Sequence, residues 1–239
     1  MNLRNYLVGH RGAMAIAPEN TLASFKVCKQ YGVDWIETDV NLLGDGTPVI
    51  FHDDSMQRIV GVDRKLSEMS FSDLDEIDVG IGFHEQFERE RIPTLESLLD
   101  FLIKNEMKLN LEIKKHDHYS DDLIVSRVLS ALHRVNFDYE DLLISSFDRN
   151  VLVLLKKCDF KGQLALLVEQ PSESDLKFMV EYGLNWINVE FSQISKALVV
   201  KSELSNYKIA AYTVNDAKEA SRLIDLGVSK IITDYPDLL

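Results

Sequence analysis

The strongest constraint on the fold of this chain is a regular alternation of strand-like and helix-like segments. The strand-like runs are short and mostly apolar, as expected for strands buried in a parallel sheet. They lie at residues 6–10, 35–40, 108–114, 142–147, 163–168, 186–191, 208–214 and 230–233. Helices are predicted between them at residues 20–31, 94–104, 121–135, 149–158, 174–183, 194–204 and 216–226. Eight strands with intervening helices in 239 residues predict an α/β protein with a (β/α)8, or TIM, barrel.

A doubly wound open sheet is the alternative that this alternation leaves open. Such a sheet commonly has a Gly-x-Gly-x-x-Gly turn after its first strand, whereas Arg11-Gly12 follows the first strand here. A chain of this length can bury a large core without disulfides, so we expect residues 1–239 to form one barrel domain. The polar stretch from His52-Asp53 to Ile92-Pro93-Thr94 is expected to be an excursion from the barrel, with a small helical piece at 70–77.

The charge and cysteine content limit the partners and the compartment. A formal charge of −13 and a pI near 4.9 argue against non-specific nucleic-acid binding and against docking to an anionic membrane. Cys28 and Cys158 lie in helix-like segments and are expected to be free thiols. The N-terminal residues lead directly into a strand, and no apolar run approaches the ~20 residues of a membrane span. We therefore expect a cytoplasmic protein without stable membrane association.

A predicted hairpin brings three polar side chains together. Two strand-like segments flank an Asp45-Gly46 turn. Centring that two-residue turn places Asp39 opposite His52, with both side chains on one face of the hairpin. Glu37 lies two residues before Asp39 and therefore shares this face. Two carboxylates and an imidazole are expected to converge there.

A third carboxylate is predicted at the same rim. In a TIM barrel the active site lies at the carboxyl ends of the strands, and Glu112 and Lys114 share a face at the end of the third strand. Two interpretations of the three carboxylates remain open: internal ion pairs such as Glu112–Lys114 or Glu37–Arg11, or a divalent metal. Oxygen ligands alone favour Mg²⁺, Ca²⁺ or Mn²⁺ over zinc.

Two histidines belong to this rim as well. His10 ends the first strand and His52 ends the hairpin, and each could be a hydrogen-bonded core residue. Beside three carboxylates, however, two imidazoles can act as base and acid on opposite sides of a phosphorus atom. A metal, Arg11 and Lys114 would neutralise the charge that develops there, so that an acidic protein could admit a phosphodiester.

Nine short motifs follow one another along the chain, from about residue 7 to residue 236. They are His10-Arg11-Gly12, Pro18-Glu19-Asn20-Thr21, Glu37-x-Asp39-Val40, His52-Asp53, Ile92-Pro93-Thr94-Leu95, Glu112-Ile113-Lys114, Ser146-Phe147, Thr213-Val214-Asn215 and Thr233-Asp234-x-Pro236. Each motif alone is weak. Together, in this order, they resemble the glycerophosphodiester phosphodiesterase family of the PLC-like phosphodiesterase superfamily.

The resemblance implies metal-dependent hydrolysis of glycerophosphodiesters, such as glycerophosphocholine or glycerophosphoethanolamine, to glycerol 3-phosphate and an alcohol. It also implies a small insertion after the second strand, at residues 46–92. A cyclic phosphate intermediate and direct attack by water are both compatible with it. By this resemblance, the metal ligands are Glu37, Asp39 and Glu112, and the general base and acid are His10 and His52. The residues that hold the phosphate are Arg11 and Lys114, and those that contact the rest of the substrate are Phe147 and Tyr212.

The sequence departs from the family pattern at a few positions. Tyr212 stands where Trp is common, and residues 54–58 differ from the usual Thr-Leu-x-Arg-Thr. His116 and His118 have no role in the family pattern and are expected to lie in a solvated loop.

Two other functions are compatible with this ancestry. A catalytically inactive binding protein would lack a histidine or a carboxylate of the motifs, and none is missing here. A related phosphodiesterase acting on lysophospholipids would need an apolar surface for membrane docking, which the charged insertion does not plainly offer. The sequence leaves open whether the chain forms a homodimer.

Overall fold

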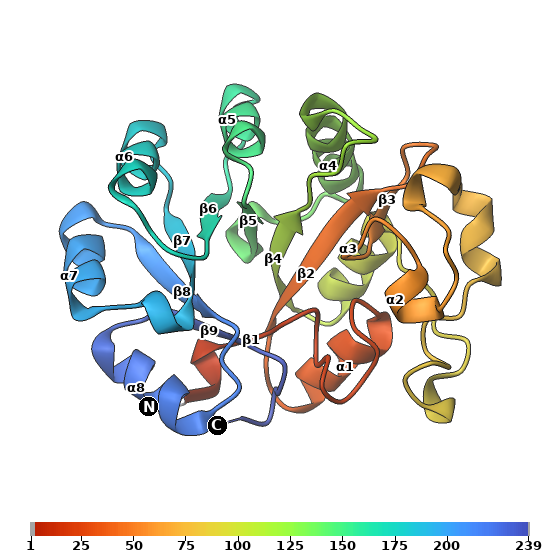
Figure 1. Cartoon of the computed structure of the whole chain (residues 1–239), viewed down its shortest axis with the longest axis horizontal. Coiled ribbons are helices and arrows are strands. Elements are labelled where there is room, and N and C mark those ends of the chain that lie inside the picture. Colours follow the sequence, from red (N-terminus) through yellow and green to blue (C-terminus); the bar gives the residue numbers. More distant parts are fainter. Residues whose placement is uncertain (1–2, 239) are drawn as a thin grey trace.

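Eight parallel strands close into a barrel in this computed structural model, which describes residues 3–238 (Figure 1). Neighbouring strands follow the order β1-β9-β8-β7-β6-β5-β4-β2, and β2 pairs with β1 to complete the circle. The predicted TIM barrel is thus confirmed. Its strands are β1 (Leu7–Gly9), β2 (Trp35–Leu42), β4 (Lys108–Ile113), β5 (Leu142–Ser146), β6 (Gln163–Val168), β7 (Trp186–Glu190), β8 (Lys208–Tyr212) and β9 (Lys230–Thr233).

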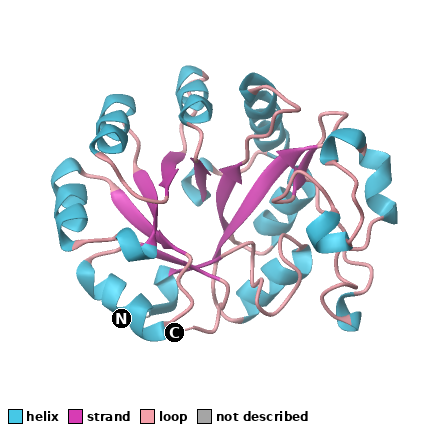
Figure 2. Cartoon of the chain, in the orientation of Figure 1, coloured by secondary structure: helices cyan, strands magenta, loops and turns pink. Residues whose placement is uncertain are grey.

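The helices surround the strands (Figure 2) and begin at side chains that accept hydrogen bonds from the first backbone N–H groups. At the start of α6, Ser172 and Asp175 form a capping box, with Ser172 N–H donating to Asp175 Oδ2 at 2.8 Å. All seven predicted helices are found. They are α1 (Leu22–Gln30), α3 (Leu95–Lys104), α4 (Asp121–Val135), α5 (Arg149–Lys157), α6 (Glu173–Tyr182), α7 (Lys196–Ser205) and α8 (Ala217–Leu226).

The alternation of side chains along the strands separates two apolar layers. On β4, Leu109 and Leu111 pack outward among the residues of the helices, while Asn110 and Glu112 face the barrel interior. A second, smaller apolar cluster comes from interior-facing residues of the strands. It consists of Val8, Leu143, Ala165, Trp186, Ala210 and Ile232. The interior of the barrel therefore combines an apolar cluster with polar side chains that line a cavity.

The predicted hairpin exists, but its register differs by one residue. β3 (Pro48–Ile50) runs antiparallel to β2, with Val40 opposite Ile50. The loop has three residues rather than two, because Leu43 N–H donates to Thr47 O at 3.0 Å and Gly46 takes a left-handed φ of +79°. Phe51 N–H consequently donates to Asp39 O at 3.0 Å. The prediction that Asp39 lies opposite His52 was wrong, since that place belongs to the residue before the histidine.

The irregular segment after β3 has an apolar cluster of its own. Met56, Leu66, Met69 and Leu74 are buried in it together with residues of the hairpin. The helical piece predicted at 70–77 is present as a 3-10 helix. The segment contains α2 (Gln57–Val60) and the 3-10 helices η2 (Leu66–Glu68), η3 (Phe71–Glu76) and η4 (Glu85–Phe87).

Two further predictions concern the whole chain. Cys28 is buried and Cys158 is exposed, and both are free thiols. Among the helices of residues 3–238, none is long and apolar enough to cross a membrane.

Candidate active site

Three carboxylates meet at the mouth of the barrel. Glu37 and Asp39 extend from β2 and Glu112 from β4, where Asp39 and Glu112 are register partners. One oxygen from each carboxylate lies within 4.8 Å of the other two, and the three residues are buried. Burial and the neighbouring negative charges raise the pKa of Glu37 to about 8 and that of Glu112 to about 7. Burial acts in the same direction on Asp39, but Lys114 and Arg11 outweigh it and lower the pKa.

Two cations only partly neutralise this cluster. Lys114 Nζ lies 2.7 Å from Glu112 and 3.5 Å from Asp39, and Arg11 Nε lies 3.3 Å from Asp39. Glu37 accepts the backbone N–H of Arg11 at 3.1 Å, while the guanidinium turns to Asp39 and Glu19. Of the two ion pairs expected from the sequence, Glu112–Lys114 is therefore present, and the side chains of Glu37 and Arg11 are not paired. Three carboxylates beside two cations make a site that could bind a metal ion.

A tight turn after β1 positions Arg11. Arg11 and Gly12 both take left-handed backbone angles, with φ of +50° and +82°. A Cβ atom at Gly12 would lie 2.3 Å from Ser24 Oγ, which donates a hydrogen bond to Arg11 O. Asn20 is also left-handed and donates to Asp39 Oδ2 at 3.0 Å. The motifs around Gly12 and Asn20 thus fix the orientations of an arginine and a carboxylate.

Each histidine of the site has a carboxylate partner at Nδ1. His10 Nδ1 is 2.6 Å from Asp234 Oδ1, and Asn215 Nδ2 donates to the other oxygen of Asp234 at 2.6 Å. His52 Nδ1 is 2.6 Å from Asp53 Oδ1. Because Nδ1 is engaged in both rings, Nε2 is the nitrogen of each that can exchange a proton with a ligand. The two imidazoles are equivalent in this respect, although they come from distant parts of the chain.

The surroundings of the two histidines shift their pKa values in opposite directions. Burial lowers the pKa of His10, but its bond with Asp234 and the nearby Glu37 outweigh burial and raise it. Burial also lowers the pKa of His52, and the charges of Lys114 and Arg11 add to this effect. Without a metal ion, these two directions are the reverse of those that suit a general base at His10 and a general acid at His52, the roles that the family resemblance implies. Glu37, which raises the pKa of His10, is also a carboxylate that a metal would neutralise.

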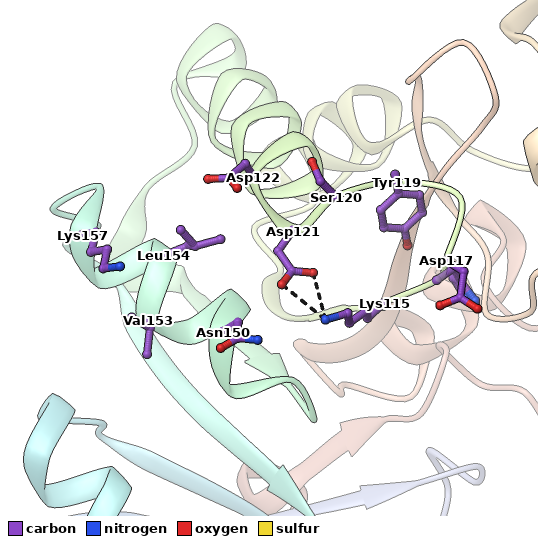
Figure 3. Close-up of a pocket in the computed structure, with 11 residues that line it drawn as sticks. Lys115, Asp117, Tyr119, Ser120, Asp121, Asp122, Asn150, Val153, Leu154 and Lys157 are labelled. Carbon is purple, nitrogen blue, oxygen red and sulfur yellow. Dashed lines mark hydrogen bonds and ion pairs between the residues drawn. The ribbon is translucent and has the colours of Figure 1, made fainter.

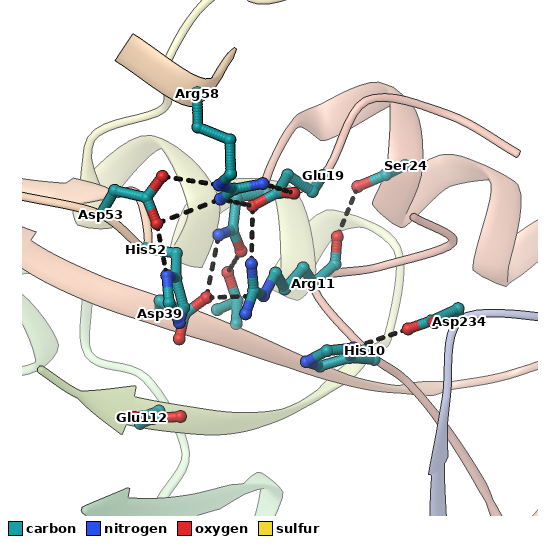
Figure 4. Close-up of polar contacts among 12 residues, drawn as sticks. His10, Arg11, Glu19, Ser24, Asp39, His52, Asp53, Arg58, Glu112 and Asp234 are labelled. Carbon is teal, nitrogen blue, oxygen red and sulfur yellow. Dashed lines mark hydrogen bonds and ion pairs between the residues drawn. The ribbon is translucent and has the colours of Figure 1, made fainter. Parts of the chain in front are cut away.

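Arg58 of α2 connects the two sides of the site (Figure 4). Its guanidinium donates to both oxygens of Asp53, at 2.7 and 3.2 Å, and to both oxygens of Glu19, at 2.6 and 2.7 Å. Asp53 in turn bonds to His52, and Glu19 accepts from Arg11 Nη1 at 2.8 Å. One arginine therefore supports the partners of both a histidine and an arginine at the barrel mouth.

The predicted site residues surround one cavity of about 230 Å³. An aromatic wall is formed by Phe147 and Tyr212, whose rings meet edge to face at 6.3 Å. Tyr212 is held by a hydrogen bond to Val168 O. The predicted residues that line the cavity are His10, Arg11, Glu37, His52, Glu112, Lys114, Phe147 and Tyr212. Asp39 lies beside them through its ion pairs with Arg11 and Lys114.

Sequence reasoning assigned no role to several residues that support this site. Their presence in the recognised motifs was the one sign in the sequence that they matter to the site, and it applies to Glu19, Asn20, Asp53 and Asp234. Arg58 lies in the part of the insertion that departs from the family pattern. Their roles depend on side-chain contacts between segments that are distant in sequence.

A larger hollow of about 520 Å³ lies outside the barrel mouth, between the loop after β4 and α5 (Figure 3). Lys115, one of the two lysines that line it, forms ion pairs with Asp121 and Asp148. The expectation of a solvated loop is met at His118, which is exposed and bonds to Leu42 O. His116 differs, because it is half-buried and its Nε2 has no hydrogen-bond partner within residues 3–238.

A TIM barrel whose mouth holds three carboxylates and two carboxylate-bonded histidines has the groups that a hydrolytic enzyme uses, and comparisons with known proteins identify the family. The glycerophosphoryl diester phosphodiesterase family model matches residues 10–238. The chain therefore belongs to this family, and the predicted enzyme class is confirmed.

Relatives of known name agree with the family match. A glycerophosphodiester phosphodiesterase from Caldanaerobacter subterraneus subsp. tengcongensis is 31% identical, over 99% of this chain and 97% of the relative. One from Bacillus altitudinis is 29% identical, over 97% and 95%. Among solved structures, an Oleispira antarctica phosphodiesterase in complex with the product sn-glycerol-3-phosphate is 29% identical, with a TM-score of 0.91 over 97% of this chain and 93% of that one.

The raised pKa values of Glu37 and Glu112 predict that metal binding depends on pH. Below about pH 7 both carboxylates hold protons in the metal-free protein, and a divalent ion must displace them. The affinity for Mg²⁺ or Ca²⁺ should therefore rise between pH 6 and pH 8.5, by about tenfold per pH unit for each proton released. Calorimetric titration in buffers of different ionisation enthalpy measures both the affinity and the protons. An affinity that stays constant across this range would contradict the prediction.

Proposed function

We propose that this protein hydrolyses glycerophosphodiesters, such as glycerophosphocholine or glycerophosphoethanolamine, to glycerol 3-phosphate and an alcohol in a metal-dependent reaction. The observation that carries the proposal is the meeting of three buried carboxylates and two carboxylate-paired histidines at a single cavity. The family match and the relative with bound sn-glycerol-3-phosphate support the substrate class.

The proposed metal ligands are Glu37, Asp39 and Glu112. An all-oxygen set suits Mg²⁺ or Ca²⁺, with Mn²⁺ as an alternative. A bound divalent ion would supply Lewis-acid stabilisation of the charge that develops on the phosphoryl oxygens. Once Glu37 and Glu112 have lost their protons, three carboxylates face two cations, and the negative charge that remains favours a divalent ion.

The proposed catalytic pair is His10 and His52, acting as general base and general acid through their Nε2 atoms. Asp234 and Asp53 fix the ring orientations by holding Nδ1. Arg11 and Lys114 would hold the phosphate, since both reach the carboxylate cluster from the rim of the cavity. The aromatic wall of Phe147 and Tyr212 would pack against the carbon atoms of the substrate.

We further propose a cytoplasmic enzyme in which residues 1–239 form one barrel domain with residues 46–92 as an insertion. A small-molecule substrate is expected rather than nucleic acid, because the chain carries a net charge of −13. The proposal includes no stable membrane association, and a homodimer is compatible with it.

A related activity on lysophospholipids is the second candidate, and one observation favours it. The irregular segment exposes four large apolar side chains, although its charged sequence did not plainly offer an apolar surface. These are Val62, Phe71, Ile81 and Phe83, which are 51%, 60%, 53% and 45% exposed.

An activity panel distinguishes the two substrate classes. Glycerophosphocholine, glycerophosphoethanolamine and lysophosphatidylcholine are offered to the enzyme with Mg²⁺, Ca²⁺ or Mn²⁺, and glycerol 3-phosphate is measured enzymatically. We expect release from the two glycerophosphodiesters, abolished by EDTA and restored by the divalent ion. If the enzyme cleaves only the lysolipid, the second candidate function is correct. Activity that persists after EDTA treatment would contradict the metal dependence.

The roles of the two histidines can be separated by the leaving group of the substrate. His10→Ala and His52→Ala should each lower kcat on glycerophosphoethanolamine by about 10²–10⁴-fold, as expected for loss of a general acid or base. A nitrophenyl ester of glycerol 3-phosphate needs no general acid because nitrophenolate leaves unprotonated. We expect His52→Ala to recover on this substrate and His10→Ala to stay impaired. The assignment fails if either variant keeps most of its activity on glycerophosphoethanolamine.

Arg58→Lys tests the link between the irregular segment and the site. Lysine keeps the charge but cannot bond to both carboxylates in the fork geometry of the guanidinium. We expect kcat to fall about 10- to 100-fold, as is typical when a residue that orients a ligand of the site is changed. Arg64→Lys is the matched control, because Arg64 pairs with Asp73 in the same segment, away from the cavity. Equal losses in the two variants, or a lowered melting temperature that accounts for the loss, would show a merely structural role.

A further inference from the structure

The floor of the active-site cavity contains three neutral polar side chains that the proposed chemistry does not use. Asn110 of β4, Ser145 of β5 and Asn188 of β7 line the same cavity as Glu112 and His10. All three are almost completely buried, with exposed fractions of 3%, 0% and 0%. They therefore belong to the interior of the barrel and not to its solvated rim.

Polar atoms of these side chains lack partners. Within residues 3–238, no hydrogen-bond partner exists for Asn110 Oδ1, Ser145 Oγ, or either polar atom of the Asn188 amide. Leaving a buried polar atom unpaired costs about 1–3 kcal/mol, so three such side chains around one cavity are expected to bind something. The cavity of about 230 Å³ has room for a small ligand beside them.

The strand register places this floor next to the carboxylates. Asn110 is the register partner of Glu37 on β2, and Ser145 is the partner of Glu112 on β4. Asn188 is the partner of Leu167, which also lines the cavity. A ligand whose anionic end lies at Arg11 and Lys114 would therefore extend its other end toward these neutral groups.

The chemistry of the floor selects a neutral, hydroxyl-bearing group. Two amides and a hydroxyl provide both donors and acceptors, and a hydroxyl group of a ligand can satisfy either kind. These three side chains carry no formal charge that could pair with an ammonium or a carboxylate. The apolar neighbours Leu167 and Ile232 offer contacts to carbon atoms only.

We propose that Asn110, Ser145 and Asn188 form a polyol subsite that binds the free hydroxyl end of the glycerol moiety. This inference rests on the proposed function and adds the specificity determinants for the glycerol side of the diester. The subsite accounts for selectivity toward glycerol, because an analogue without the hydroxyl would leave buried amide groups unpaired. The alcohol on the other side of the phosphorus is not selected by this floor.

Two substrates separate glycerol recognition from phosphodiester cleavage. Glycerophosphoethanolamine carries the glycerol hydroxyls, whereas bis(4-nitrophenyl) phosphate carries none. In Asn188→Leu and Ser145→Ala, we expect the ratio of kcat/KM for the first substrate to that for the second to fall about tenfold or more, the effect of losing one hydrogen bond of 1.4 kcal/mol. Ser202→Ala is the matched control, since Ser202 is a buried serine of α7 away from the cavity, and it should leave the ratio unchanged.

The outcomes distinguish this inference from the proposed function. An unchanged ratio in both floor variants, with wild-type activity on both substrates, overturns the polyol subsite and leaves the proposed function intact. A wild-type enzyme that cleaves neither substrate overturns both. A crystal structure with sn-glycerol-3-phosphate adds a direct readout: we expect a glycerol hydroxyl within hydrogen-bond distance of Asn188, and a floor occupied only by water would overturn the subsite.

Discussion

Three carboxylates on two neighbouring strands cannot all carry charge in a buried barrel mouth without cations around them. Asp39 retains its charge because Arg11 and Lys114 both reach it. Burial, together with the repulsion that remains, raises the pKa of Glu37 and Glu112 toward neutrality. The rest of the site follows from this constraint, since the left-handed turn at Arg11 and the interior face of β4 bring the two cations to the cluster.

The barrel and the main site residues could be predicted from the sequence because both depend on short periodicities. The period of two along β4 separates Leu111 from Glu112, and the carboxyl ends of parallel strands gather at one rim whatever the helices between them contain. The starts of the helices could be predicted for a similar reason, since the side chain of a capping residue such as Ser172 accepts a hydrogen bond from a backbone N–H only three residues away. Local chemistry was sufficient for all of these features.

The register of the hairpin and the outer contacts of the site could not be predicted in the same way. Loop length depended on whether Gly44 joined the turn with Asp45 and Gly46, and one residue of difference moved Phe51 into the place expected for His52. His52 still lines the cavity, because β3 ends at Ile50 and the alternation of side chains along the strand does not extend to His52. Hydrogen bonds between residues far apart in the sequence could not be predicted either, such as the bond between His10 and Asp234, which are separated by 224 positions.

The contrast between the mouth and the floor of the barrel suggests how one cavity handles both ends of a diester. Interior positions of a TIM barrel are usually filled by apolar side chains, and Ala165 and Ala210, the register partners of Ser145 and Asn188, follow that rule. Asn110, Ser145 and Asn188 break it with polar atoms that find no partner within residues 3–238. Departures from local packing rules are expected at functional sites, where a ligand supplies the missing contacts. Charged groups at the rim are thus suited to phosphorus chemistry, while neutral groups below them are suited to recognition of hydroxyls.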